Sequence, residues 1–144
     1  MRGIALDLDN TIVPWHTDRL VPGVRLWLDL VRAAGIRLCL VTNNYGAQAK
    51  DVAREIDVPL VRGALKPMPA AFGHALRELQ TPASQSLAIG DQLFTDVLGA
   101  KLLGMRAIYV QPSDRREFPT TRFLRLLERP VFWRLRAVSS REQA

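Results

Sequence analysis

The chain has 144 residues, of which 48% are hydrophobic and 24% charged, and this composition excludes a wholly disordered or fibrous protein. Its length suits one domain that folds without a metal or a disulfide. The single cysteine, Cys39, lies in an apolar segment, which predicts a buried, reduced thiol and a cytoplasmic location. No apolar stretch reaches the roughly 18 residues of a membrane-spanning helix. Asp7 and Asp9 also interrupt the N-terminal candidate for a signal peptide.

The net charge of +6 is concentrated near the C-terminus. Residues 115–144 hold eight arginines against three glutamates, so this segment accounts for +5 of the total. Such a segment favours a polyanionic partner, namely an anionic membrane surface, a nucleic acid or a phosphorylated polymer. A solvated helix face explains the same charge equally well.

Apolar segments of strand length alternate with helical patterns, which predicts an α/β, three-layer Rossmann-like fold around a central, mainly parallel sheet. Strands are expected at residues 4–8, 36–41, 60–61, 86–89 and 107–110. Helices are expected from residue 24 to a left-handed Gly35, over residues 49–56, from a first turn at Pro67 to Leu79, and from Leu93 to Gly104. Residues 81–85 are predicted to form a loop.

Residues 1–112 are expected to form the core. Residues 111–120 are polar, contain Pro112 and Pro119, and are predicted to be a connector. Residues 113–144 as a whole are predicted to be a basic amphipathic helical extension of the same domain. Pro130 is expected to divide this extension into two short helices.

The polar residues that could catalyse a reaction or bind a ligand follow the ends of the apolar strands. In an open parallel sheet the carboxyl ends of the strands line one crevice, where ligands bind. These residues are expected to share one site: Asp7, Asp9, Thr42, Asn43 and Asp91.

Paired carboxylates in this pattern indicate a metal site. Asp7 and Asp9 are two residues apart, so in an extended chain they point the same way and repel each other unless a cation lies between them. Asp91 and Asp96 complete a site made of oxygen ligands, which favours Mg²⁺.

Each of these residues also has an ordinary structural interpretation. Asp91 and Asn44 suit helix N-caps, Asp96 suits the first turn of a helix, and Lys66 suits the solvated surface. Several motifs agree in order and in position at strand ends, which favours a catalytic site over these separate explanations. His16 and His74 are interpreted as structural or surface residues, and a contact of His16 with the substrate is a second interpretation.

The chain resembles the haloacid dehalogenase (HAD) superfamily of phosphotransferases over residues 3–110. The segment from Asp7 to Thr11 is similar to the first motif of that superfamily. Thr42 is similar to the second motif and Lys66 to the third. The fourth is matched by Gly90-Asp91 with Asp96.

The resemblance implies a phosphatase mechanism. Asp7 would be the nucleophile that forms an aspartyl-phosphate, and Asp9 would be the general acid and base. Lys66 and the Thr42 hydroxyl would bind the phosphoryl oxygens, with backbone N–H groups near Leu8 and Asn43 assisting. Mg²⁺ would be held by Asp7, the Asp9 carbonyl group and Asp91, with Asp96 as a further ligand or support.

The intervals after the first motif and before Lys66 are too short for a cap domain, which favours a bulky phosphate ester as substrate. The chain is most similar to the capless subfamily IIIA phosphatases of the YqeG type, related to phosphatidylglycerophosphate phosphatases. This resemblance implies removal of the terminal phosphate of phosphatidylglycerophosphate in phospholipid biosynthesis, at the inner face of the membrane. Two alternatives remain open: a phosphatase acting on a sugar phosphate or a nucleic acid end, and a non-enzymatic module that binds RNA or a ribosome through the basic tail.

Overall fold

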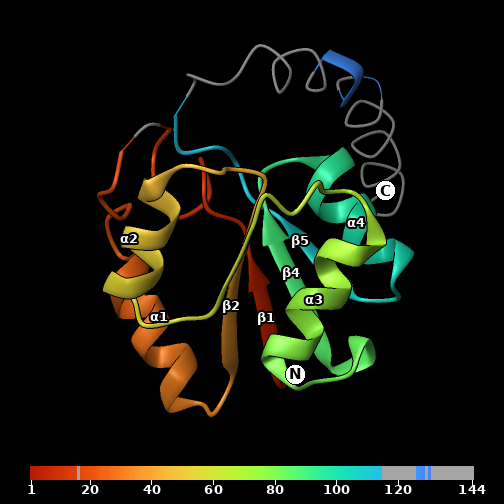
Figure 1. The fold of residues 1–144 in the computed structure, drawn as a ribbon, viewed down its shortest axis with the longest axis horizontal. Coiled ribbons are helices and arrows are strands. Elements are labelled where there is room, and N and C mark those ends of the chain that lie inside the picture. The colour runs from red at the N-terminus through yellow and green to blue at the C-terminus, as the bar shows by residue number, and fades with distance from the viewer. Residues whose placement is uncertain (16, 115–125, 129, 131–144) are drawn as a thin grey trace, which may run out of the picture.

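The computed structural model describes residues 1–15, 17–114, 126–128 and 130, and Figure 1 shows their arrangement. They form a five-stranded, fully parallel sheet in the order β3-β2-β1-β4-β5. This sheet confirms the predicted α/β class. The strands are β1 (Gly3–Leu6), β2 (Arg37–Thr42), β3 (Leu60–Arg62), β4 (Ser86–Gly90) and β5 (Arg106–Tyr109).

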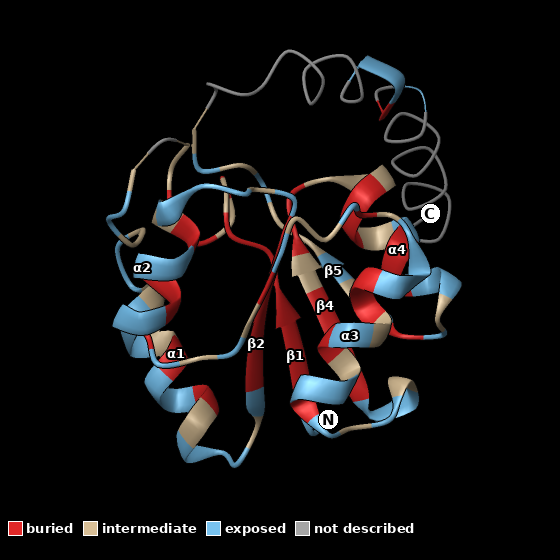
Figure 2. Ribbon diagram, in the orientation of Figure 1, coloured by how far each residue is buried: buried red, intermediate tan, exposed pale blue. Residues whose placement is uncertain are grey.

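Helices cover both faces of the sheet, which gives the predicted three layers (Figure 1). Alternation along β1 assigns the faces: Ile4 and Leu6 pack in the core with two helices, and Ala5 packs in the core with the other two. In Figure 2 β1 is coloured as buried, and the helices carry buried residues beside exposed ones. The first pair of helices is α1 (Val24–Ala33) and α2 (Ala47–Glu55), and the second is α3 (Pro69–Leu79) and α4 (Leu98–Leu102).

The first strand is shorter than predicted, so Asp7 lies beyond it and not within it. The Asp7 N–H still donates to the Ile89 carbonyl (2.9 Å), and the chain then turns around the Leu8 carbonyl, which accepts from three successive N–H groups. Asn10 has a φ of 60°, in the left-handed region. The first motif therefore lies in a turn directly after the end of β1.

Two helix predictions also need correction. The third helix begins at Pro69, so Pro67 lies before it, after a cis peptide bond with Lys66. The single helix predicted from Leu93 is divided into a π-helical turn, Leu93–Val97, and α4. The other boundaries differ from the predictions by a residue or two, and a short 3₁₀ turn, Ala83–Gln85, lies in the predicted loop.

Of the predicted helical extension, residues 113–144, the structure describes only residues 113–114, 126–128 and 130. Cys39 is buried, as expected, and burial raises the pKa of its thiol to about 12. None of the helices in the described part of the chain combines the length and the hydrophobicity that a membrane span requires.

Candidate active site

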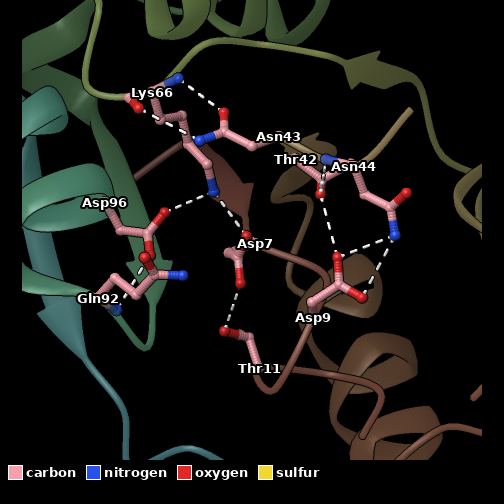
Figure 3. A network of polar contacts seen from close by, with 9 residues as sticks. All are labelled: Asp7, Asp9, Thr11, Thr42, Asn43, Asn44, Lys66, Gln92 and Asp96. Atoms are coloured by element: carbon pink, nitrogen blue, oxygen red, sulfur yellow. Dashed lines mark hydrogen bonds and ion pairs between the residues drawn. The ribbon is translucent and has the colours of Figure 1, made fainter. Parts of the chain in front are cut away.

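The residues predicted to carry chemistry meet at the carboxyl edge of the sheet (Figure 3). Asp7 follows the central strand β1. Its neighbours β2 and β4 bring Thr42 and Asp91 to either side of it. The chain leaves β1 toward one side of the sheet and later returns to the other, and such a switch point is where open parallel sheets bind ligands.

Lys66 is the electrostatic centre of the site. Its ammonium group donates to Asp7 Oδ1 and to Asp96 Oδ1, each at 2.6 Å, and all three side chains are buried. Burial alone would lower the pKa of Lys66, but the carboxylates of Asp7 and Asp96 outweigh burial and raise it. The interpretation of Lys66 as a solvated surface residue is therefore wrong.

Asn43 holds the backbone of Lys66 in place. The Asn43 side chain accepts from the Lys66 N–H (2.7 Å) and donates to the Lys66 carbonyl (3.2 Å), as Figure 3 shows. This pair of hydrogen bonds joins the loop after β2 to the loop after β3. The sequence analysis assigned Asn43 only through its backbone, and its side chain has this second role.

Asp9 lies in a different environment from Asp7. Its carboxyl group accepts from the Asn44 amide (3.2 Å) and, at 3.5 Å, from the Thr42 hydroxyl. Burial, and then the charge of Asp7, raise the pKa of Asp9. Thr42, which was predicted to bind phosphoryl oxygens, contacts the candidate acid in this structure. Asn44 is not the N-cap of α2, because Gly46 occupies that position.

Three buried carboxyl groups form a candidate metal site. One oxygen each from Asp7, Asp91 and Asp96 can be chosen so that all three lie within 4.8 Å of one another. The donors are hard oxygen atoms, and the Lys66 ammonium contacts two of the three carboxyl groups, Asp7 and Asp96, so the residues present fit Mg²⁺. The Asp9 side chain contacts Thr42 and Asn44, and the assignment of the Asp9 backbone carbonyl as a ligand stays a prediction.

The loop that follows β4 is shaped by Asp96. The second carboxylate oxygen of Asp96 accepts from the Gln92 N–H (3.1 Å). Asp96 therefore closes the turn after β4, in addition to lying in the first turn of a helix. Asp91 does not cap this segment, since Gln92 is its N-cap. Asp91 is fully buried behind the turn.

Gly90 permits the close packing of this loop. A Cβ atom at Gly90 would lie 2.3 Å from Asp96 Cγ and 2.6 Å from Asp96 Cβ. We expect Gly90→Ala to displace Asp96 and to lower both the activity and the free energy of unfolding, by about 1–3 kcal/mol for the latter. Urea unfolding and phosphate release measure the two effects.

Gly73→Ala is the matched control for that substitution. Gly73 lies in α3, and an added Cβ atom would meet only the end of the Arg77 side chain, at 3.9 Å. Because alanine favours a helix over glycine, Gly73→Ala should leave activity unchanged and stabilise the protein slightly. Equal behaviour of the two variants would contradict the packing argument at Gly90.

Two further residues support the site and were not singled out from the sequence. The Thr11 hydroxyl donates to Asp7 Oδ2 (2.8 Å), so both oxygens of Asp7 are held. The buried carboxylate of Glu128 accepts from the Leu93 N–H (2.7 Å) and the Phe94 N–H (3.3 Å), at the start of the π-helical turn. Thr11 could have been found as part of the first motif, but no local pattern connects Glu128 to residue 93.

The remaining residues that the sequence analysis named take no part in these contacts or lie outside the described part of the chain. His74 is half-exposed on α3 and lies 3.4 Å from Glu78, in keeping with its interpretation as a surface residue. His16 is outside the described residues. Leu8 is fully buried beside the site, and its backbone contact with a phosphoryl group stays a prediction.

Comparison with known proteins supplies a family for this arrangement. Residues 13–104 match the family model of haloacid dehalogenase-like hydrolases. A probable phosphatase of Bacillus subtilis, YqeG, is 35% identical over 91% of this chain and 76% of its own length. The mitochondrial phosphatidylglycerophosphatase of Saccharomyces cerevisiae is 26% identical over 77% of this chain and 67% of its own.

Other relatives are longer than this chain. A glyceraldehyde 3-phosphate phosphatase of Pyrococcus abyssi is 35% identical, and the match covers 63% of this chain and 42% of that enzyme. Among solved structures, a HAD phosphatase from Thermococcus onnurineus superposes with a TM-score of 0.60 at 25% identity, over 70% of this chain and 51% of that one. The chain thus spans about half the length of several proteins that it matches.

Proposed function

The chain belongs to the haloacid dehalogenase-like hydrolases and is a phosphatase, and from this membership we propose that it is a magnesium-dependent phosphomonoesterase acting through an aspartyl-phosphate on Asp7. The observation that carries the proposal is that Asp7 and Asp9 lie in opposite electrostatic environments. Asp7 accepts from the Lys66 ammonium and from the Thr11 hydroxyl, so a cation lies against the proposed nucleophile and both of its oxygens are held. Asp9 is held by neutral donors and has a raised pKa, which favours its protonated form.

In the proposed first step, an oxygen of Asp7 attacks the phosphorus atom and the bond to the ester oxygen breaks. Asp9 gives its proton to that oxygen, so the alcohol leaves in neutral form. In the second step Asp9 takes a proton from water, and the water oxygen attacks the phosphorus atom of the phosphorylated Asp7. Inorganic phosphate leaves, and both residues return to their starting states.

The other residues would stabilise charge during these steps. Mg²⁺ held by Asp7, Asp91 and Asp96 would neutralise negative charge on the phosphoryl oxygens. Lys66 would add a fixed ammonium on the same side, and the Asn43 amide keeps Lys66 in position by binding its backbone. Two contacts hold the Asp96 carboxyl group in place for either role, as a ligand of the ion or as a support for Lys66. They are the ion pair with Lys66 and the hydrogen bond from the Gln92 N–H.

For the substrate we propose phosphatidylglycerophosphate or a similarly bulky phosphate ester. Relatives whose names specify phosphatidylglycerophosphate support this choice, as do the short connections of the core and the positive charge of the chain. The proposed location is the cytoplasm, with peripheral attachment at the inner face of the membrane. A sugar phosphate is the second candidate, since the Pyrococcus relative is named for one.

Phosphate release from three substrate classes tests the proposal. We would compare phosphatidylglycerophosphate in mixed micelles with glyceraldehyde 3-phosphate and p-nitrophenyl phosphate, with Mg²⁺ and with a chelator. We expect Mg²⁺-dependent release, fastest from the lipid. Faster release from glyceraldehyde 3-phosphate would favour the second candidate, and no release from any ester, together with RNA binding, would favour the binding module.

Asp9→Asn tests the double role of Asp9. A p-nitrophenolate leaving group needs no proton, so this variant should still release up to one p-nitrophenol per protein in a burst and then stop, because water is not activated. Rapid-quench or stopped-flow absorbance measures the burst. Steady turnover at the wild-type rate would contradict the assigned role, and Asp29→Asn, in an exposed pair on α1, is the control.

A further inference from the structure

Three exposed apolar side chains border the site, and we call them the rim: Tyr45, Leu65 and Met68. Their residues are 65%, 62% and 58% exposed. Tyr45 lies in the loop after β2, two residues beyond Asn43, while Leu65 and Met68 flank Lys66 in the connection from β3 to α3. The rim therefore belongs to the two loops that carry active-site residues.

Hydrogen bonds and close packing fix these two loops against each other. The Gly63 N–H donates to the Asn44 carbonyl (3.4 Å) and the Ala64 N–H to the Thr42 carbonyl (3.0 Å). The Tyr45 hydroxyl donates to the Gly63 carbonyl (3.3 Å), and its ring packs so closely that a Cβ atom at Gly63 would lie 2.1 Å from it. Tyr45 thus covers Gly63 and remains exposed, and the two loops form one surface.

Leu65 is unusual in both exposure and backbone conformation. Its φ of 55° is in the left-handed region, which leucine adopts at an energetic cost and which asparagine tolerates better. The apolar side chain at this position gains no burial within the described part of the chain that would offset this cost. An external apolar partner would supply that burial.

The charge around the rim favours an anionic partner. The segments 43–46 and 62–68 contain no acidic residue. Their cations are Lys66, which is buried and paired, and Arg62, which is exposed and donates to the Tyr45 carbonyl. Exposed Arg62 therefore gives the surface a positive charge next to its apolar groups.

We propose that the rim docks the protein on an anionic phospholipid surface, the rim entering the interface and Arg62 lying at the level of the headgroups. The proposal rests on the proposed function for its substrate, because a phosphate ester on a lipid reaches Asp7 only if this edge of the sheet faces the lipid. Tyrosine, aliphatic side chains and arginine together suit the boundary between headgroups and acyl chains. Contiguous exposed apolar groups beside a site commonly mark such a contact.

The test uses the double variant Leu65→Asn/Met68→Gln, which removes apolar character and nearly preserves side-chain size. Its matched control is Leu26→Gln/Leu30→Gln, which changes two leucines of 65% and 62% exposure on α1, away from the rim loops. Co-sedimentation measures binding of the full chain to vesicles of phosphatidylcholine with and without phosphatidylglycerol. Hydrolysis is measured on phosphatidylglycerophosphate in vesicles and on p-nitrophenyl phosphate.

We expect the rim variant to bind phosphatidylglycerol vesicles about tenfold more weakly, as follows from the loss of partial burial of two large apolar groups. Hydrolysis of the vesicle substrate should fall by a similar factor, while hydrolysis of p-nitrophenyl phosphate and all properties of the α1 control stay unchanged. Arg62→Gln should weaken binding only to the vesicles that contain phosphatidylglycerol.

Vesicle binding that the rim variant retains in full would overturn the proposal. A wild-type dimer that this variant converts to a monomer, with unchanged vesicle binding, would assign the rim to a second copy of the chain and also overturn it. Failure of the proposed function is distinguishable, because the wild type would then hydrolyse no ester while rim-dependent vesicle binding would still support the docking surface.

Discussion

Asp7→Asn should lower phosphate release by about 10⁴-fold or more, as expected when a covalent nucleophile is removed. Asparagine has nearly the same size as aspartate, so the side chain can still accept from Thr11. Asp96 remains as a partner for Lys66, so the variant should fold. The effect is therefore expected on catalysis far more than on structure.

The measurement is steady-state phosphate release together with mass spectrometry of the protein quenched during turnover. Wild type should show a phosphorylated form that Asp7→Asn lacks. Asp51→Asn changes an exposed carboxylate of α2 that is paired with Arg54, and it should behave as wild type. A phosphorylated form in Asp7→Asn, or release at the rate of the Asp51 control, would refute the assignment of the nucleophile.

Lys66→Met should abolish activity and also destabilise the protein strongly. The substitution leaves Asp7 and Asp96 buried without their shared cation, and removal of one partner from a buried ion pair costs about 3–5 kcal/mol. The methionine is close in length to the lysine, so loss of packing contributes little. Urea unfolding should therefore show a large decrease in the free energy of unfolding.

Mg²⁺ provides a diagnostic for the same variant. If the three carboxyl groups bind the ion, Mg²⁺ should raise the unfolding midpoint of Lys66→Met, because it replaces part of the lost positive charge. Lys50→Met, at an exposed position of α2, is the control and should change neither activity nor stability appreciably. A Lys66 variant as stable as this control would show that the buried pairs contribute nothing.

The sequence was sufficient to predict the sheet and the meeting of the acidic residues, because both follow from apolar strands that end in polar residues. Asp7 and Asp91 come together for this reason, although residues 8–90 separate them. The burial of Lys66 did not follow from any local pattern. It depends on how far the connection after β3 folds back over β1, which is fixed by Asn43 and by the turn before Pro69.

Other differences have local physical causes. The first strand ends early because the Leu8 carbonyl accepts from three N–H groups of the following turn. The apolar residues 4–8 give no sign of this turn, since their pattern continues through it. The helix predicted from Leu93 starts as a π-helical turn because Asp96 folds back on the Gln92 N–H and Gly90 allows the approach. Hydrophobic periodicity predicts which residues face the core, but it does not predict hydrogen bonds between side chains and the backbone.

Because Glu128 binds the loop after β4, the shortest active fragment must extend beyond the last motif. A fragment that stops after β5 would contain every acidic and basic residue assigned to catalysis, yet it would lose the anion that binds the Leu93 and Phe94 N–H groups. Chimeras that exchange C-terminal segments between related phosphatases would consequently alter the loop that bears Asp91 and Asp96. In such chimeras, a single exchange of the C-terminal segment would change substrate preference and metal affinity at the same time.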